Sequence, residues 1–322
     1  MIRINKKVLA LILIIILLGI FYLIINFLSP KKDYVENPLL MKNLGVSTQE
    51  LDISELSKIE SVDIPVYFVR SKIHTVLVEQ FVKRISINLE KEEVVKDTYF
   101  KWSDEKNLIT YDTYTDKVIF DLEKGIPVQL GEEILSSFYL NYFDSDFKVP
   151  IVEEEKEEEG GVRYLGNRVV DDIPIEFGFN KPYSAILEVD QEGKAIYGEL
   201  LLAEIDKYET YIPTIKDEEL KRYVNAPEYP KEHYLDTSVL VDTLSLYDYL
   251  DPAWGEMEKN TSGCKATDSE LILLFKNTEQ GYLLPVYRMS ANCDVEYKNQ
   301  LYSVPATFYL NAVDPMYVTN TN

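Results

Sequence analysis

An uninterrupted apolar run near the N-terminus constrains this 322-residue chain more than any other feature of its sequence. Residues 8–28 read VLALILIIILLGIFYLIINFL, and none of these 21 residues carries a charge. As a helix with a rise of ~1.5 Å per residue, the run would be ~31 Å long, about the hydrocarbon thickness of a bilayer. We therefore expect a transmembrane helix here rather than a buried core helix.

A cleaved signal peptide is the alternative interpretation of this run. Its apolar core would be shorter, ~7–15 residues, and small residues would mark the cleavage site. Residues 27–30 read FLSP instead, with no A-x-A pattern. Arg3, Lys6 and Lys7 precede the run, which favours a cytoplasmic N-terminus by the positive-inside rule. We expect a signal anchor, hence a single-pass protein of the cell membrane with an extracytoplasmic C-terminal region.

Composition excludes several classes of function. The chain has 33 Lys+Arg against 55 Asp+Glu, a formal net charge of −22. Nucleic acid is not expected as a partner, because phosphate binding needs a basic footprint. With only two cysteines and two histidines, the chain has too few ligands for a four-cysteine zinc site and few for a histidine-based one. We expect no metal and no other cofactor.

Beyond the apolar run, the pattern predicts an α+β fold of about three units, each a helix followed by an antiparallel meander. The first helix is predicted over 72–89, where apolar residues recur at i+4 steps. The second begins at Glu132, and the third covers 237–250. An isolated strand is expected at 64–69. The strands of the three meanders are expected at 98–102, 108–111 and 117–122, then 162–170, 183–190 and 195–205, and then 269–276, 282–290 and 303–312.

These signals also divide the chain into regions. We expect a cytoplasmic tip and anchor over 1–28, a polar stalk over 29–62, a first α+β domain over 63–150, a second α+β region over 162–315 and a tail over 316–322. The region between the two domains, 151–161, contains the sequence EEEKEEE followed by two glycines. Like charges in such a run repel one another and bury nothing, so an acidic linker or exposed loop is expected. A cation site would need its ligands at a fixed turn geometry.

The two cysteines flank the predicted hairpin at 269–290, whose turn is centred on Glu279. Opposite residues of a hairpin have a constant index sum, and the midpoint of 264 and 293 is 278.5, so Cys264 and Cys293 should face each other. A facing pair is close enough for a disulfide, and export would provide oxidising conditions. We predict a structural Cys264–Cys293 disulfide, with two buried free thiols as the alternative.

The sequence contains no strong catalytic motif. G-x-S-x-G, H-E-x-x-H, a Walker-type loop and G-x-G-x-x-G are all missing. Both histidines, His74 and His233, are expected to be surface or packing residues. Acidic pairs such as 144/146 and 171/172 could support glycosidase chemistry, but 55 acidic residues generate such pairs by chance. No catalytic residue is assigned, and we expect a protein that is not an enzyme.

Several short motifs resemble a known family. They are YFKWSD at 99–104, LITYD at 108–112, DIPI at 172–175 and AILEVDQEGK at 185–194. Together with the anchor, they resemble the extracytoplasmic YycH/YycI regulators and, more distantly, PepSY-type domains, over residues 64–315. The resemblance implies a helix packed on an antiparallel sheet and non-catalytic regulation of an envelope partner such as a sensor kinase. The EEEKEEE run and the two cysteines depart from the YycH/YycI pattern.

The sequence thus favours a membrane-anchored protein that binds and regulates an envelope protein. Two other classes stay open: an envelope glycan or peptide hydrolase that uses carboxylates, and an inhibitor or chaperone of a secreted peptidase, which the PepSY-like pattern suggests. A hydrolase should show a pocket with two carboxylates ~5–9.5 Å apart, at least one with a raised pKa. A binding module should show an exposed apolar or tyrosine-rich patch or an open sheet edge.

Overall fold

The computed structural model describes most of the chain after residue 48. Its described residues are 33–34, 39–41, 44, 47 and 49–320, except 57, 71, 86, 158–159, 178–182, 228, 237–260, 298 and 315–316. The predicted transmembrane segment 8–28 and the predicted helix 237–250 lie outside the described residues. Within the described part of the chain, no helix is long and apolar enough to cross a membrane.

The structure is mainly β, so the predicted α+β class is wrong. Strands take 54% of the described residues, whereas the described helices α2 (Thr75–Arg84), α3 (Ile134–Phe143) and α4 (Asp217–Tyr223) have 10, 10 and 7 residues. Helices α2 and α3 lie where helices were expected. The predicted division into helix-plus-meander units is wrong, because the strands that follow these two helices belong to one sheet rather than to two separate meanders.

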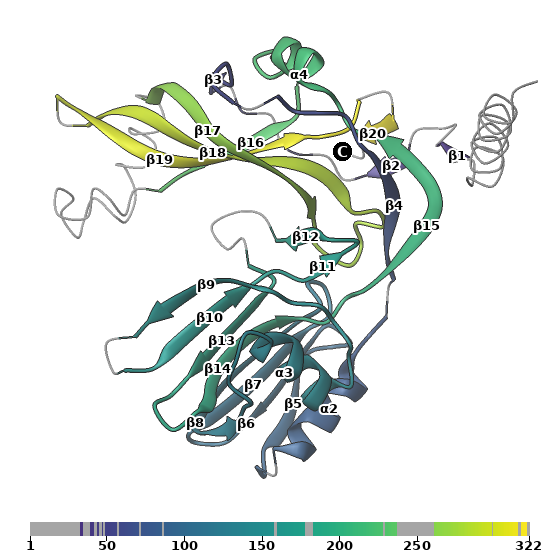
Figure 1. The fold of residues 1–322 in the computed structure, drawn as a ribbon. Coiled ribbons are helices and arrows are strands. Elements are labelled where there is room, and N and C mark those ends of the chain that lie inside the picture. Colours follow the sequence, from purple (N-terminus) through teal and green to yellow (C-terminus); the bar gives the residue numbers. More distant parts are fainter. Residues whose placement is uncertain are drawn as a thin grey trace, which may run out of the picture.

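That sheet forms the lower half of Figure 1 and has eight antiparallel strands. Its order is β5-β6-β7-β8-β14-β13-β10-β9, with bounds β5 Glu90–Val95, β6 Tyr99–Ser103, β7 Asn107–Asp112, β8 Lys117–Pro127, β9 Ile151–Lys156, β10 Val162–Gly166, β13 Ala185–Val189 and β14 Lys194–Leu201. The pairing of β8 with β14 merges the two expected meanders. Helices α2 and α3 cover one face, where Phe81, Phe120 and Phe138 pack together.

A second sheet forms the upper half of Figure 1. Its strands are ordered β11-β12-β17-β18-β19-β16, and β3 pairs with β17. The bounds are β3 Leu51–Asp52, β11 Val169–Val170, β12 Ile173–Glu176, β16 Lys231–Leu235, β17 Thr261–Leu274, β18 Leu284–Tyr297 and β19 Gln300–Asn311. Helix α4 lies above this sheet, and its Leu220 packs into a core with Met289 and Phe308.

A long two-stranded ribbon connects the two sheets. It consists of β4 (Asp63–Arg70) and β15 (Glu204–Pro213), and β1 (Asp33–Tyr34) adds to β15 in parallel. Strand β2 (Leu39–Met41) pairs with β20 (Val318–Asn320). The region 29–62, expected as a stalk, therefore contributes three strands to the folded body. Strands of two or three residues are too short for the alternation of apolar and polar residues to be recognised.

Buried polar groups hold the chain where β14 leads into this ribbon. Arg168, which is only 3% exposed, donates to the carbonyl oxygens of Leu201 at 3.1 Å and Ala203 at 2.7 Å. The Tyr139 hydroxyl donates to the same Leu201 oxygen at 3.1 Å. Burial lowers the pKa of Arg168 to about 10, so the group remains cationic at neutral pH. Its guanidinium also lies 3.5 Å from the centroid of the Phe147 ring.

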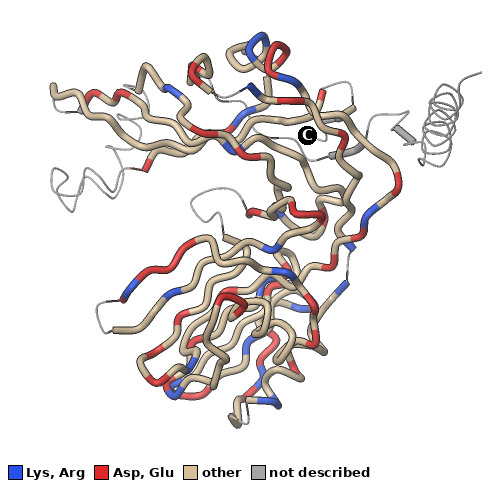
Figure 2. The backbone as a smooth tube through the Cα atoms, in the orientation of Figure 1, with Lys and Arg blue, Asp and Glu red and all other residues tan. Residues whose placement is uncertain are grey.

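The first four residues of the acidic run, 153–156, lie in a strand rather than in the expected linker or loop. Residues Ile151–Lys156 form β9, the edge strand of the eight-stranded sheet, paired with β10. Its glutamates are exposed, and they appear in Figure 2 as a red stretch of this edge. Charge repulsion does not prevent a strand here, because an edge strand needs only backbone pairing on one side while its side chains remain in water.

The predicted disulfide is confirmed, since Cys264 of β17 is bonded to Cys293 of β18. Both residues are buried, at 2% and 0% exposure. The register of the two strands shifts between Ser262 and Lys265, and Gly263 has a φ of +57° within that irregularity. Glycine accepts this left-handed conformation without strain, which allows Cys264 to lie beside its partner.

The disulfide should contribute substantially to stability. Replacing both cysteines with alanine should lower the free energy of unfolding by about 3 kcal/mol, because the bond restricts the unfolded chain. Urea unfolding of the full chain in detergent, followed by far-UV circular dichroism, measures the difference. Ser290→Ala, at an exposed position of β18, is the matched control. Equal stability of the oxidised and reduced wild-type protein would contradict the prediction.

Candidate functional site

A groove of about 520 Å³ lies on the open face of the eight-stranded sheet, opposite α2 and α3. Successive side chains of a strand point to opposite faces. In β13, Leu187 points into the helix-covered core, whereas its neighbours Ile186 and Glu188 line the groove. The full lining is Asp121, Glu155, Arg163, Leu165, Tyr183, Ile186, Glu188, Ile196, Tyr197 and Glu199.

The groove combines apolar, aromatic and acidic groups. Its apolar members are Leu165, Ile186 and Ile196, and its aromatic members are Tyr183 and Tyr197. Its charged members are four carboxylates and one guanidinium. The formal charge of the lining is therefore −3. Such a lining offers apolar contact area and rings to a ligand, together with an excess of negative charge.

Both tyrosines hold carboxylates in place. The Tyr183 hydroxyl donates to Glu153 at 2.7 Å, and the Tyr197 hydroxyl donates to Glu199 at 2.5 Å. Burial, together with the neighbouring carboxylate in each case, raises the pKa of both hydroxyls. The two hydroxyls therefore stay protonated and act as fixed donors. Glu199, only 5% exposed, also forms an ion pair with Lys117 at 3.0 Å.

The single guanidinium of the groove is shared by several carboxylates. Arg163 lies 3.5 Å from Glu155, 3.4 Å from Glu157 and 3.3 Å from Glu188. Although partial burial opposes it, these carboxylates raise the pKa of Arg163. One positive charge cannot neutralise three negative ones. Excess negative charge therefore remains at this end of the groove.

A second hollow, of about 360 Å³, lies where the two sheets meet; we call it the junction pocket. Its lining is Lys148, Pro150, Ile151, Val152, Asn167, Val169, Asp172, Pro174, Glu270 and Arg288. Arg288 of β18 connects two carboxylates, with Glu176 at 2.7 Å and Glu270 at 2.6 Å. Charged groups of the upper sheet thus meet Ile151 and Val152 of the lower sheet around this pocket.

Glu176 lies behind the junction pocket and is completely buried. Besides Arg288, it receives hydrogen bonds of 3.4 Å from the Asn167 amide and 3.4 Å from the Tyr309 hydroxyl. Burial raises the pKa of Glu176 to about 7, although the positive charge of Arg288 opposes the shift. This carboxyl therefore changes its charge close to neutral pH.

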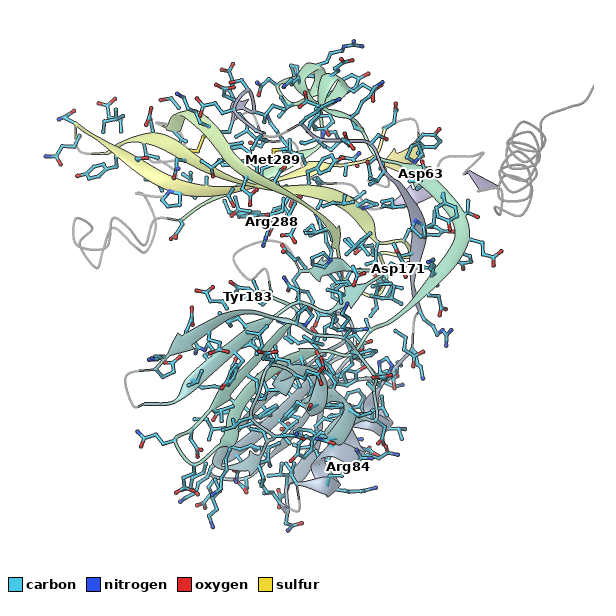
Figure 3. All side chains as sticks on the ribbon, in the orientation of Figure 1. Asp63, Arg84, Asp171, Tyr183, Arg288 and Met289 are labelled. Atoms are coloured by element: carbon cyan, nitrogen blue, oxygen red, sulfur yellow. A yellow bond between two sulfur atoms is a disulfide. The ribbon has the colours of Figure 1, made fainter. Side chains whose placement is uncertain are left out.

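The groove and the junction pocket border the same gap between the sheets. Figure 3 shows Tyr183 and Arg288 on opposite sides of this gap, and the charge of Arg288 influences the pKa of Tyr183. Strand β9 joins the two hollows, because its first residues, Ile151 and Val152, line the pocket and its Glu155 lines the groove. We call the groove, the junction pocket and β9 together the inter-sheet site.

Neither acidic pair considered from the sequence places both of its carboxylates in the inter-sheet site. Asp171 and Asp172, with φ of +51° and +62°, form the two-residue turn between β11 and β12. Asp171 accepts from the Tyr67 hydroxyl at 2.8 Å and pairs with Lys207 at 2.6 Å, whereas Asp172 pairs with Lys148 at the junction pocket. Both central residues of such a turn need positive φ, which aspartate tolerates.

His74 belongs to a buried polar cluster at the base of the ribbon. It is 2% exposed, and its Nδ1 lies 2.9 Å from the Asp116 carboxylate. The Tyr111 hydroxyl donates to Asp116 at 2.7 Å and accepts from the His74 backbone N–H at 2.8 Å. None of these three residues lines the groove or the junction pocket. His74 is therefore buried rather than on the surface, and it lies outside the inter-sheet site.

His233 lies on β16 and packs against β19. His233 stacks on Phe308 with a centroid distance of 5.4 Å, and its Nδ1 shares a hydrogen bond of 2.8 Å with the Ser47 hydroxyl. In the described part of the chain, no group of three or more His, Cys, Asp or Glu side chains could hold a metal ion.

Glu176 should make stability depend on pH. Its pKa rises from 4.5 to about 7 on folding, so its stabilising effect is present below pH 4.5 and is lost as the pH rises through 7. From pH 4.5 to 8, Glu176→Gln should therefore gain stability relative to wild type, on the order of 2–3 kcal/mol. Urea unfolding across this pH range measures the change, with exposed Glu154→Gln as control. If the free energy of unfolding changed equally with pH in wild type and in Glu176→Gln, this prediction would be wrong.

The cluster around His74 should contribute to stability through Tyr111. Tyr111→Phe should lower the free energy of unfolding by about 1–3 kcal/mol, because it leaves the buried His74 N–H without its acceptor and removes one of the donors to Asp116. Urea unfolding at neutral pH measures this loss. Tyr99→Phe, on the neighbouring strand, is the control and should have little effect. Equal stability of the two variants would show that the Tyr111 hydroxyl contributes nothing.

Comparison with known proteins identifies no family. No family model matches the sequence, and no curated protein does. Among solved structures, an uncharacterized protein from Eubacterium rectale is similar, with a TM-score of 0.44 and 10% sequence identity. The match covers 82% of this chain and 88% of that one. A likeness this weak carries no argument, and the comparisons give no link to YycH/YycI or PepSY proteins.

Proposed function

We propose that the inter-sheet site binds a positively charged segment of another protein of the cell envelope, and that the protein regulates this partner by binding. The observation that carries the proposal is the lining of the groove, where four carboxylates face one guanidinium beside two tyrosines and an apolar floor. This is the pattern expected of a site for lysine or arginine side chains.

Each part of the groove matches a part of such a side chain. The aliphatic stem of lysine or arginine can lie along Leu165, Ile186 and Ile196 while the charged end remains near the carboxylates. The tyrosine rings attract a cation through their faces. Because Tyr183 and Tyr197 already fix Glu153 and Glu199, the site loses little side-chain freedom when it binds.

The charge of the whole chain supports the same partner class. A formal net charge of −22 attracts a basic segment over several ångströms and speeds its association. It repels the anionic surface of a membrane and acidic proteins. If residues 8–28 span the membrane as the sequence predicts, the anchor also raises the effective concentration of the site for other membrane proteins.

The hydrolase alternative has one observation in its favour. Glu176 is a carboxyl with a raised pKa, and Arg288 joins it to a second carboxyl, Glu270. However, Glu176 is completely buried behind the junction pocket, so a substrate in the pocket would not contact it. Turnover of cell-wall glycan or peptide by wild type that is lost in Glu176→Gln would favour the hydrolase. An inhibitor or chaperone of a secreted peptidase would differ from the proposed regulator only in the partner that it binds.

Binding can be measured with a defined probe. A fluorescent eight-residue peptide of alternating lysine and valine should bind the full chain in detergent, and its acidic counterpart of glutamate and valine should not. Affinity should fall with added salt, because exposed charges are screened. The double variant Asp121→Asn/Glu188→Gln should weaken binding by about fivefold to tenfold. Fluorescence anisotropy measures all of these affinities.

The matched control removes the same charge from the other edge of the sheet. Glu90→Gln/Glu92→Gln changes two exposed residues of β5, which does not line the groove, and should leave the affinity unchanged. Equal binding of the basic and acidic peptides would contradict the proposed function. Equal losses in the two double variants would show that net charge, rather than the groove, attracts the peptide.

A further inference from the structure

We infer that the basic segment binds as an additional β-strand along the free edge of β9, an inference that rests on the proposed function. Within the described residues, β9 pairs only with β10. Alternate backbone N–H and C=O groups of Ile151–Lys156 therefore point away from the sheet with no partner in the described chain. An extended peptide can use such groups for main-chain hydrogen bonds, while its side chains provide specificity.

The side chains of β9 select the charge of this added strand. Glu153 and Glu155 lie on the groove side, where they contact Tyr183 and Arg163. Glu154 lies on the other side, opposite Tyr164. Acidic side chains thus border the edge on both faces of the sheet. Opposite charges on neighbouring strands stabilise their pairing, and like charges oppose it.

A second copy of this chain does not fit the edge. Two β9 strands would place glutamates beside glutamates, and the other edge of the sheet is also acidic. That edge is β5, with the sequence EKEEVV, in which all six residues are exposed. Each edge strand has three glutamates and one lysine, so pairing of either edge with either edge brings two net negative strands together. A basic strand from a different protein is the occupant that the charges favour.

The two edges differ in what lies beside them. At β5, a lysine of the strand itself, Lys91, pairs with Glu79 at 2.6 Å and lies 5.1 Å from the Phe100 ring centroid. At β9, the groove adjoins one part of the strand and the junction pocket adjoins its beginning. Side chains of a strand added at β9 would thus find two cavities beside them. If the glutamates of β9 served only to prevent aggregation through this exposed edge, cavities beside the strand would not be needed.

Backbone methylation separates strand pairing from charge attraction. The lysine–valine peptide and a version with every internal backbone N–H methylated have the same charge and length, but the methylated peptide cannot donate main-chain hydrogen bonds. Methylation should weaken binding to the full chain by about tenfold or more, because several such bonds are lost. Fluorescence anisotropy compares the two affinities.

Amide hydrogen exchange locates the added strand. Saturation with the unmethylated peptide should slow exchange within 151–156, and exchange within 90–95 of β5 should not change. Equal affinity of the two peptides, or unchanged amide exchange at β9, would show that the peptide does not bind as an added strand. The groove proposal would survive either result if Asp121→Asn/Glu188→Gln still weakened binding. If neither peptide bound, both the proposed function and this inference would be wrong.

Discussion

The buried guanidinium of Arg168 fixes the point at which the two sheets are connected. A charged group loses much hydration when it is buried, and here two backbone carbonyls and an aromatic ring replace the water. Those carbonyls belong to Leu201 and Ala203, just before β15 begins. Together with the Tyr139 hydroxyl, which donates to the same Leu201 oxygen, this side chain therefore helps to set the direction in which the ribbon leaves the lower sheet. The gap that contains the inter-sheet site depends on the same geometry.

Local patterns in the sequence predict local structure well. Apolar spacing at i+4 places α2 and α3, and hairpin arithmetic identifies the Cys264–Cys293 bond. The same patterns do not reveal which strands pair. The joining of β8 to β14 depends on Gly198, where a Cβ would collide with the ring of Phe120. A glycine in a predicted strand indicates a close approach but does not name the partner, so the two meanders could not be recognised as one sheet.

The inter-sheet site could be predicted only in part for a related reason. Strands were expected at β8, β10, β13 and β14 but not at β9, and the alternation in β13 separates Leu187 from Ile186 and Glu188. The positions of α2 and α3 decide which face of the sheet remains open. These positions depend on tertiary packing. The burial of Glu176 depends on Arg288, far along the chain. The EEEK sequence of β9 predicts exposure correctly, but its extended conformation comes from pairing with β10.

The pairing of β1 with β15 limits how far the protein could reach from a membrane. If the chain spans the membrane over 8–28, as its sequence predicts, residues 29–32 alone lie between the bilayer and Asp33 of β1. Even fully extended, that connection measures only ~17 Å. The folded body would then stay within a thin layer above the lipid and would not extend far into the envelope. A partner would have to present its basic segment at that height.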